Sequence, residues 1–147
     1  MTKIHWLGTG LSAIPGLKML IENGHTVVVY NRTVDKAIEA LSGVNGDYQV
    51  VPFSLEAVEQ YTNAGDVVVS MLPGNFHVPV AELCISLNAH FVSSSYISDE
   101  MRILNDAANE KNLCLVNEVG LDPGIDHSMS HALVEDYKNS GVFSAQN

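Results

Sequence analysis

Basic residues are the scarcest charged class in this chain. Its 147 residues include 7 lysines and arginines against 17 aspartates and glutamates, for a formal net charge of −10. Proteins that bind nucleic acid or anionic membranes present clustered positive charge to phosphate groups. The composition therefore argues against a nucleic-acid-binding or membrane-binding protein. Isolated basic side chains can still make local contacts.

Cysteine and long apolar runs are also lacking. Cys84 and Cys114 are the two cysteines, and they stand far apart in apolar segments. Small disulfide-stabilised secreted domains need more cysteines, so we predict two buried free thiols. No apolar run reaches the roughly 18 residues of a membrane-spanning helix, and no signal-peptide pattern opens the chain. On these grounds we expect a protein of the cytoplasm.

Short apolar segments alternate with helical patterns along the chain. Segments such as 67–69 are apolar at every position, as in strands of a parallel sheet that is buried on both faces. The alternation predicts an α/β, Rossmann-type doubly wound parallel sheet. Strands are expected at 4–7, 26–30, 48–51, 66–71, 90–93 and 113–116. Helices are expected at 12–23, 33–41, 55–62, 78–87, 99–111 and 126–138.

A glycine-rich loop lies between the first strand and the first helix. Its pattern is G-x-G-x-x-A, with Gly8, Gly10 and Ala13 at the defining positions and Leu11 and Ser12 between them. The first glycine permits a tight turn, the second lets the backbone approach a pyrophosphate, and the small third residue lets helix and strand pack closely. The N-terminus of the helix would offer free N–H groups to the phosphates. The loop predicts dinucleotide binding.

The end of the second strand indicates which dinucleotide is bound. NAD-specific sites place a carboxylate there for the ribose 2′-hydroxyl, whereas this chain has Asn31, Arg32 and Thr33. Arg32 can pair with a 2′-phosphate in bidentate fashion, with hydrogen bonds from its two neighbours. The next acid, Asp35, comes too late and is expected to face solvent. NADP is therefore the predicted cofactor, and a plain surface charge is the competing interpretation of Arg32.

Two further strand ends carry polar side chains. His77 follows the fourth strand and is either an acid/base group or simply the first residue of a helix. Tyr96 follows three serines, 93–95, after the fifth strand. Their hydroxyl groups lie at the sheet edge where ligands bind in this fold. Tyr96 does not belong to a Y-x-x-x-K pattern, which argues against a short-chain dehydrogenase.

The segment 117–127, after the sixth strand, concentrates three carboxylates and an Asp-Pro-Gly turn. Glu118, Asp122 and Asp126 are candidates for acid/base chemistry, because crowding raises carboxyl pKa values. The alternatives are that Asp126 only caps the last helix and Glu118 only holds the loop. His127 and His131 share a helix face without the H-E-x-x-H pattern of zinc proteases, so no metal is expected.

Taken together, these residues resemble the saccharopine dehydrogenase family, and most closely its NADP-dependent, glutamate-forming members. The resemblance runs from about residue 4 to residue 137, and the last block is the most specific. The matching blocks are 8–10 with Pro15, 31–33, 72–73 with 76–77, 94–98 and 117–127.

The resemblance implies a set of site residues. Implied contacts to NADP come from Gly10 through Ala13, Asn31, Arg32, Thr33, Leu72, Ser95, Tyr96, Leu121, Asp122 and Pro123. Implied contacts to the amino-acid substrate come from Tyr96, Ile97 and Asp122. The family reaction condenses glutamate with aminoadipate semialdehyde and reduces the imine with a hydride from the cofactor. Asp122, Tyr96 and His77 are the expected catalytic residues.

The resemblance also divides the chain into two parts. Residues 1–125 would form the NADP-binding Rossmann domain. Residues 126–147 would form the first helix of a substrate domain, with a strand beginning near residue 142. We expect the rest of that domain, and a homodimer contact through it, to be missing, so this chain alone should bind cofactor without catalysis.

Two other interpretations fit parts of the sequence. The segments 24–33 and 71–73 also resemble β-hydroxyacid dehydrogenases. That family would need a glycine- and serine-rich substrate loop where this chain has residues 94–97, and it lacks the 117–127 block. A non-catalytic nucleotide-sensing module would not need Tyr96 and Asp122.

Overall fold

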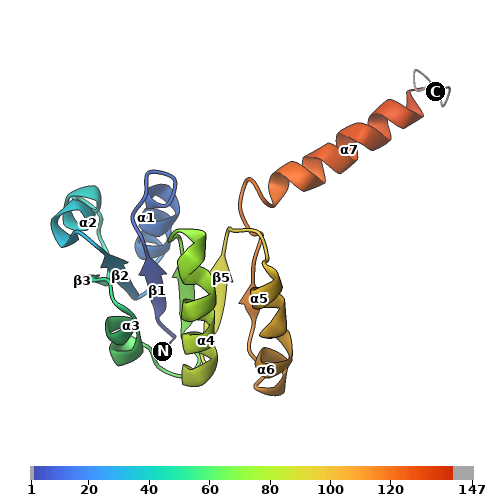
Figure 1. Ribbon diagram of the computed structural model, residues 1–147. Coiled ribbons are helices and arrows are strands. Elements are labelled where there is room, and N and C mark those ends of the chain that lie inside the picture. Colours follow the sequence, from blue (N-terminus) through green and yellow to red (C-terminus); the bar gives the residue numbers. More distant parts are fainter. Residues whose placement is uncertain (1, 141–147) are drawn as a thin grey trace.

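The computed structural model describes residues 2–140, which form one parallel sheet flanked by helices (Figure 1). The strands are β1 (Ile4–Leu7), β2 (Val27–Asn31), β3 (Tyr48–Pro52), β4 (Val67–Ser70), β5 (His90–Ser93) and β6 (Leu115–Val116). The helices are α1 (Ile14–Glu22), α2 (Val34–Ala40), α3 (Leu55–Tyr61), the 3₁₀ helix η1 (Gly74–Phe76), α4 (His77–Leu87), α5 (Asp99–Ile103), α6 (Asn105–Glu110) and α7 (Ile125–Asn139).

The six strands are arranged in the order β3-β2-β1-β4-β5-β6, and every neighbouring pair is parallel. The order reverses beside β1, which pairs with both β2 and β4. This is the strand order of a doubly wound Rossmann sheet. The predicted fold class is therefore confirmed.

The sheet separates two apolar cores. Trp6 packs with Leu17 and Ile21 of α1 on one face. The next residue, Leu7, points to the other face and packs with Val58 of α3 and Val80 of α4. Because side chains alternate along a strand, one continuous apolar strand supplies both cores.

Three local predictions were wrong. The helix expected at 99–111 is divided at Leu104 into α5 and α6. The sixth strand has two residues, Leu115 and Val116, where four were expected. Cys84 is buried as predicted, but Cys114 is exposed. The sixth strand lies at the edge of the sheet, so its side chains are covered by fewer neighbours.

The last helix differs from the others because it projects away from the sheet (Figure 1). None of the residues of α7 is buried. The strand expected near residue 142 lies outside the described residues. Within residues 2–140 no helix combines the length and apolar character that crossing a bilayer requires.

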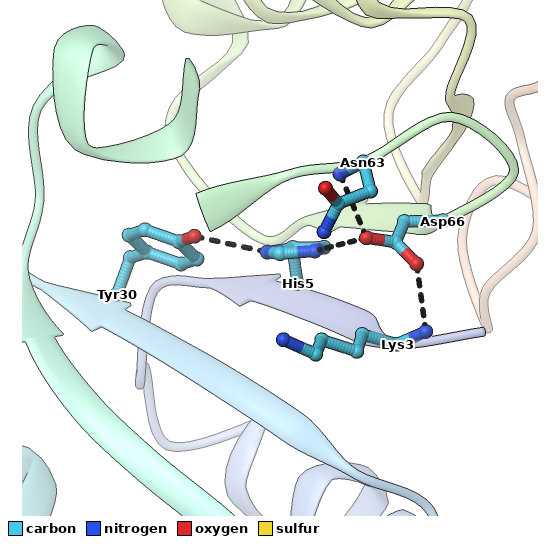
Figure 2. A network of polar contacts seen from close by, with 5 residues as sticks. All are labelled: Lys3, His5, Tyr30, Asn63 and Asp66. Carbon is cyan, nitrogen blue, oxygen red and sulfur yellow. Dashed lines mark hydrogen bonds and ion pairs between the residues drawn. The ribbon is translucent and has the colours of Figure 1, made fainter. Parts of the chain in front are cut away.

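A buried polar network joins β1, β2 and the start of β4 (Figure 2). The fully buried ring of His5 lies 2.9 Å from Tyr30 Oη through Nδ1 and 3.1 Å from Asp66 Oδ2 through Nε2. A carboxylate only accepts, so Nε2 carries the proton and Nδ1 accepts from the Tyr30 hydroxyl. The Asp66 carboxylate also accepts from the backbone N–H groups of Lys3 and Asn63, each at 2.8 Å.

Burial and pairing shift the pKa values of this network. Burial lowers the pKa of His5, although its hydrogen bond to Asp66 and the charge of that residue oppose the shift. Burial raises the pKa of the Tyr30 hydroxyl, so this group stays protonated and can donate. Burial alone would raise the pKa of Asp66, but the hydrogen bonds from Lys3, Asn63 and His5, with the attraction of His5, lower it overall. At neutral pH the network holds a neutral histidine and a charged aspartate.

The lowered pKa of His5 predicts a pH-dependent stability. The unfolded chain, with a histidine pKa near 6.5, binds more protons than the folded chain below that pH. The free energy of unfolding should therefore fall between pH 7 and pH 5, by at most about 1.4 kcal/mol per pH unit from this group. In His5→Gln, whose amide can keep both hydrogen bonds but cannot titrate, urea unfolding across this range should show a smaller fall.

The control is His25→Gln, because His25 is exposed and lies outside the network. That variant should lose stability with falling pH as the parent does. Equal pH dependence in the parent and His5→Gln would contradict the assignment.

Candidate functional site

The carboxyl ends of the parallel strands bring the sequence-predicted segments to one edge of the sheet. The glycine loop follows β1, Asn31 ends β2, Leu72 follows β4, and Tyr96 follows β5. In open α/β sheets ligands bind at this edge, where the strand order reverses. The geometry of each segment determines what it can bind.

Gly8 has no room for a side chain. Its φ of +96° lies in the left-handed region, and a Cβ there would stand 3.0 Å from the carbonyl oxygen of Met71. Ala13 is buried at the start of α1, as the small third position of the loop requires. Leu11 and Ser12 are exposed, and within residues 2–140 their backbone N–H groups donate to no protein atom. The loop therefore presents free donors to solvent beside Gly10, where a Cβ would meet nothing.

Arg32 is exposed directly after β2. No carboxylate of the described residues lies within 4.0 Å of its guanidinium group. The Asn31 side chain instead stabilises the turn, since its amide donates to the carbonyl of Thr33 at 2.8 Å. Asp35 lies exposed in the first turn of α2, as expected. The guanidinium group is thus available to an anionic ligand.

His77 lies away from solvent at the start of α4. Its side chain is buried, with Nε2 2.8 Å from the carbonyl oxygen of Leu72 and the ring edge-on to Phe91 at 6.1 Å. A carbonyl accepts only, so Nε2 carries the proton. The histidine thereby holds the segment 72–77 in place.

Tyr96 and Asp122 are 26 residues apart and meet in a hydrogen bond. The tyrosine hydroxyl donates to Asp122 Oδ1 at 2.8 Å, and both side chains are exposed. This hydrogen bond raises the pKa of Tyr96, and the negative charges of Asp122, Asp126 and Glu118 act in the same direction. The ring of His127 lies beside Tyr96, with centroids 6.2 Å apart. Two of the three expected catalytic residues are therefore in direct contact.

Two side chains tie the loop after β6 to the loop after β5. Glu118 Oε1 accepts from the backbone N–H of Ile97 at 3.0 Å, and its own N–H donates to the carbonyl of Ser95 at 3.1 Å. The Ser93 hydroxyl donates to Asn117 Oδ1 at 3.0 Å. In this geometry Glu118 supports the loop, which is the structural alternative considered for it.

A tight turn connects this loop to α7. Gly124 has a φ of +147°, and a Cβ there would collide with the backbone of Gly120. The N–H of Gly120 donates to the carbonyl of Pro123 at 3.1 Å. The Asp126 carboxylate accepts from the N–H of Gly124 at 2.9 Å and lies 3.5 Å from His127 Nε2. Asp126 thus holds the start of α7, although the residue at the N-cap position is Gly124.

A hollow of about 390 Å³ lies among these segments. Its volume is within the range of small-molecule sites. Ser12 of the glycine loop and Asp122 of the last loop both line it, over a floor that includes Trp6, Val69 and Val92. The structure therefore joins the predicted phosphate loop to the predicted catalytic loop. Within residues 2–140 no three histidine, cysteine or acidic side chains are grouped as metal ligands.

Comparison with known proteins identifies the family. Residues 4–116 match the family model described as the saccharopine dehydrogenase NADP binding domain. The chain belongs to this family. The match supports NADP as the cofactor and favours the first of the three interpretations of the sequence over a β-hydroxyacid dehydrogenase or a sensing module.

Individual relatives agree with the family match. The chain is 34% identical over 140 residues to the saccharopine dehydrogenase [NADP(+), L-glutamate-forming] of Pyricularia oryzae, covering 92% of this chain and 30% of the relative. It is 36% identical over 114 residues to the α-aminoadipic semialdehyde synthase of Arabidopsis thaliana, covering 76% and 11%. The apo saccharopine dehydrogenase (L-Glu forming) of Saccharomyces cerevisiae superimposes with a TM-score of 0.78 at 27% identity, covering 96% and 32%. The chain thus spans about a third, or less, of the length of these relatives.

Sequence reasoning missed the apolar floor of the hollow and the bond between Ser93 and Asn117. Trp6, Val69 and Val92 are in register on neighbouring strands and point to the same face. Alternation along the strands could have shown this shared face. The hydrogen bond depends on how the loop after β6 approaches the end of β5, for which the sequence carries no local signal.

The contact between Tyr96 and Asp122 predicts a spectroscopic change. In Asp122→Asn the tyrosine loses a charged acceptor and a nearby negative charge, so the pKa of Tyr96 should fall toward the ordinary value of 10.0. Titration of ¹³Cζ-labelled tyrosine by NMR would follow this group among the 5 tyrosines. In the control, Asp35→Asn, the pKa of Tyr96 should stay that of the parent. An unchanged pKa in Asp122→Asn would show that the bond does not form in solution.

Proposed function

We propose that this chain is the NADP(H)-binding part of an oxidoreductase that acts on the CH–NH bond of an amino-acid conjugate. The observation that carries the proposal is the open glycine loop of Gly8, Gly10 and Ala13, which faces the same hollow as Asp122. The free N–H groups of the loop and the guanidinium group of Arg32, none of which has a partner among residues 2–140, would supply donors for phosphates. The family match supports the same conclusion.

The cofactor contacts follow from the exposed donors. The N–H groups of Leu11 and Ser12 would bind the pyrophosphate, because the N-terminus of α1 favours anions. Arg32 would pair with the 2′-phosphate, while Asn31 maintains the turn that carries it. Leu72 lies beside Gly8, at 3.4 Å from the position of a Cβ there, and we propose that it contacts the cofactor next to the glycine loop.

Tyr96 and Asp122 are the groups we propose to meet the substrate. The chemistry that a bound NADPH would supply is hydride transfer to the imine carbon, after which the nitrogen would require a proton. The Tyr96 hydroxyl donates a hydrogen bond to Asp122, and Asp122 lines the hollow. This pair can bind or protonate the substrate nitrogen. Ile97, whose N–H is fixed by Glu118, would position the substrate backbone. We assign His77 to positioning of the segment 72–77, because its ring is buried and bonded to Leu72.

The substrate class proposed is a secondary amine formed between glutamate and aminoadipate semialdehyde, as the names of the relatives suggest. The chain alone should bind NADPH but show no turnover of saccharopine with NADP⁺, because it spans about a third of those relatives. Residence in the cytoplasm and a homodimer contact outside the described residues remain predictions.

The proposed role of Arg32 predicts a preference for NADPH over NADH. Titration of the protein with NADPH and NADH, followed by the fluorescence of Trp6, should show tighter binding of NADPH. Arg32→Ala should weaken NADPH binding by about tenfold or more, because a charged hydrogen-bonded pair is lost. Its effect on NADH, which has no 2′-phosphate, should be much smaller.

The matched control is Lys18→Ala, which removes one positive charge from α1 rather than from the end of β2. That variant should bind both cofactors as the parent does. Equal losses for NADPH and NADH in Arg32→Ala would refute the assigned role. Preference of the parent for NADH would refute the proposed function itself.

A further inference from the structure

A second cavity lies on the opposite face of the sheet from the hollow at Asp122. Its volume is about 330 Å³. Leu115 of β6 contributes to it and is in register with Phe91, which belongs to the core under α4. The floor of the first hollow, by contrast, comes from Val69 and Val92 on the other face. The cavity is lined by Ile97, Met101, Arg102, Asn105, Leu115 and Asn117.

The lining combines three apolar side chains with three that carry N–H donors. Met101 is buried, and Ile97 and Leu115 are half-buried, so they form an apolar wall. Arg102, Asn105 and Asn117 supply the guanidinium and amide groups. An apolar wall with a few polar groups is the usual composition of a small-molecule site.

The guanidinium group of Arg102 is weakly engaged. Among the described residues its ion pair is with Asp99, at 4.0 Å between Nε and Oδ1, and the Asp99 side chain is fully exposed. Exposed pairs of this kind contribute little. Arg102 therefore lines a cavity with most of its hydrogen-bonding capacity unused.

The amides leave donors available as well. Asn117 accepts from Ser93 through Oδ1, and no hydrogen bond from its Nδ2 occurs within the described residues. Asn105 Nδ2 makes a contact of 3.5 Å to Asp106 Oδ1, at the limit for a hydrogen bond. One guanidinium group and two amide groups of the cavity lining thus keep donors that have no strong partner within the described residues.

We propose that this cavity binds an aliphatic carboxylate, with its head on Arg102 and its hydrocarbon stem against Met101 and Leu115. A planar guanidinium matches a carboxylate in bidentate geometry. The acidic neighbours Asp99 and Asp106 disfavour a more highly charged head such as a phosphate. The site lies on the opposite face of the sheet from the proposed cofactor hollow. Carboxylate binding can therefore be tested independently of NADP binding.

The test is an NMR titration of the 147-residue chain with pentanoate, without NADPH. Pentanoate should shift the amide signals of Ile97 and Met101 and the side-chain NH₂ signals of Asn105 and Asn117. Pentanamide, the neutral analogue, should bind at least about tenfold more weakly, since it lacks the charged head. Absence of these shifts, or equal binding of pentanamide, would overturn the proposal, as would tighter binding of methyl phosphate.

Arg102 provides the matched variants. Arg102→Met should lose pentanoate affinity by about tenfold, while Arg102→Lys should keep part of it as a point charge. Lys18→Met removes the same charge at a distance and should bind pentanoate as the parent does. The Arg102 side chain is 64% exposed, so both variants should fold, which the dispersion of their amide spectra will verify. Unchanged affinity in Arg102→Met would overturn the proposal.

Discussion

The position of β1 between β2 and β4 is the constraint on which the rest of the structure depends. Leu7 is aligned with Tyr30 on one side and with Ser70 on the other. Because all strands are parallel, their following loops meet at one edge, at the reversal of the strand order. The close pairing with β4 brings the carbonyl of Met71 against Gly8, so a side chain on the residue after β1 would be both crowded and strained. The pairing of β1 with β4 therefore also determines which residue can begin the glycine loop.

The strands were predictable because parallel strands are apolar at every position, and this signal is local. Five of them begin and end within one residue of the expected bounds. The sixth failed for a physical reason. Only Leu115 and Val116 of this segment pair with β5, so the strand ends after two residues and Cys114 is left exposed, whereas β3 at the other edge pairs with β2 over five residues. Composition alone does not distinguish an edge strand from a central one.

The site shows the same division between local and tertiary information. The sequence placed Tyr96 and Asp122 at one edge, but their hydrogen bond depends on the turn of Gly120 and Gly124, whose backbones touch. The ring of His77 points into the protein, where it donates to the carbonyl of Leu72 and packs against the ring of Phe91. Residue type and spacing leave both alternatives open for that histidine, because the direction of its ring depends on tertiary packing.

Because the chain is acidic, short-range contacts and not its overall charge must select an anionic ligand. With a net charge of −10, the long-range field repels anions such as a phosphorylated dinucleotide. At 0.1 M salt this field is screened beyond about 10 Å. Binding would then depend on donors within hydrogen-bonding distance. In the proposed mode the N–H groups of Leu11 and Ser12, which donate to no protein atom within residues 2–140, would provide them without adding charge. In the same proposed mode Arg32 would add charge at a single point, at the 2′-phosphate that distinguishes NADP from NAD. A more basic domain would bind many anions, whereas this arrangement favours the one whose phosphates match the loop and the arginine together.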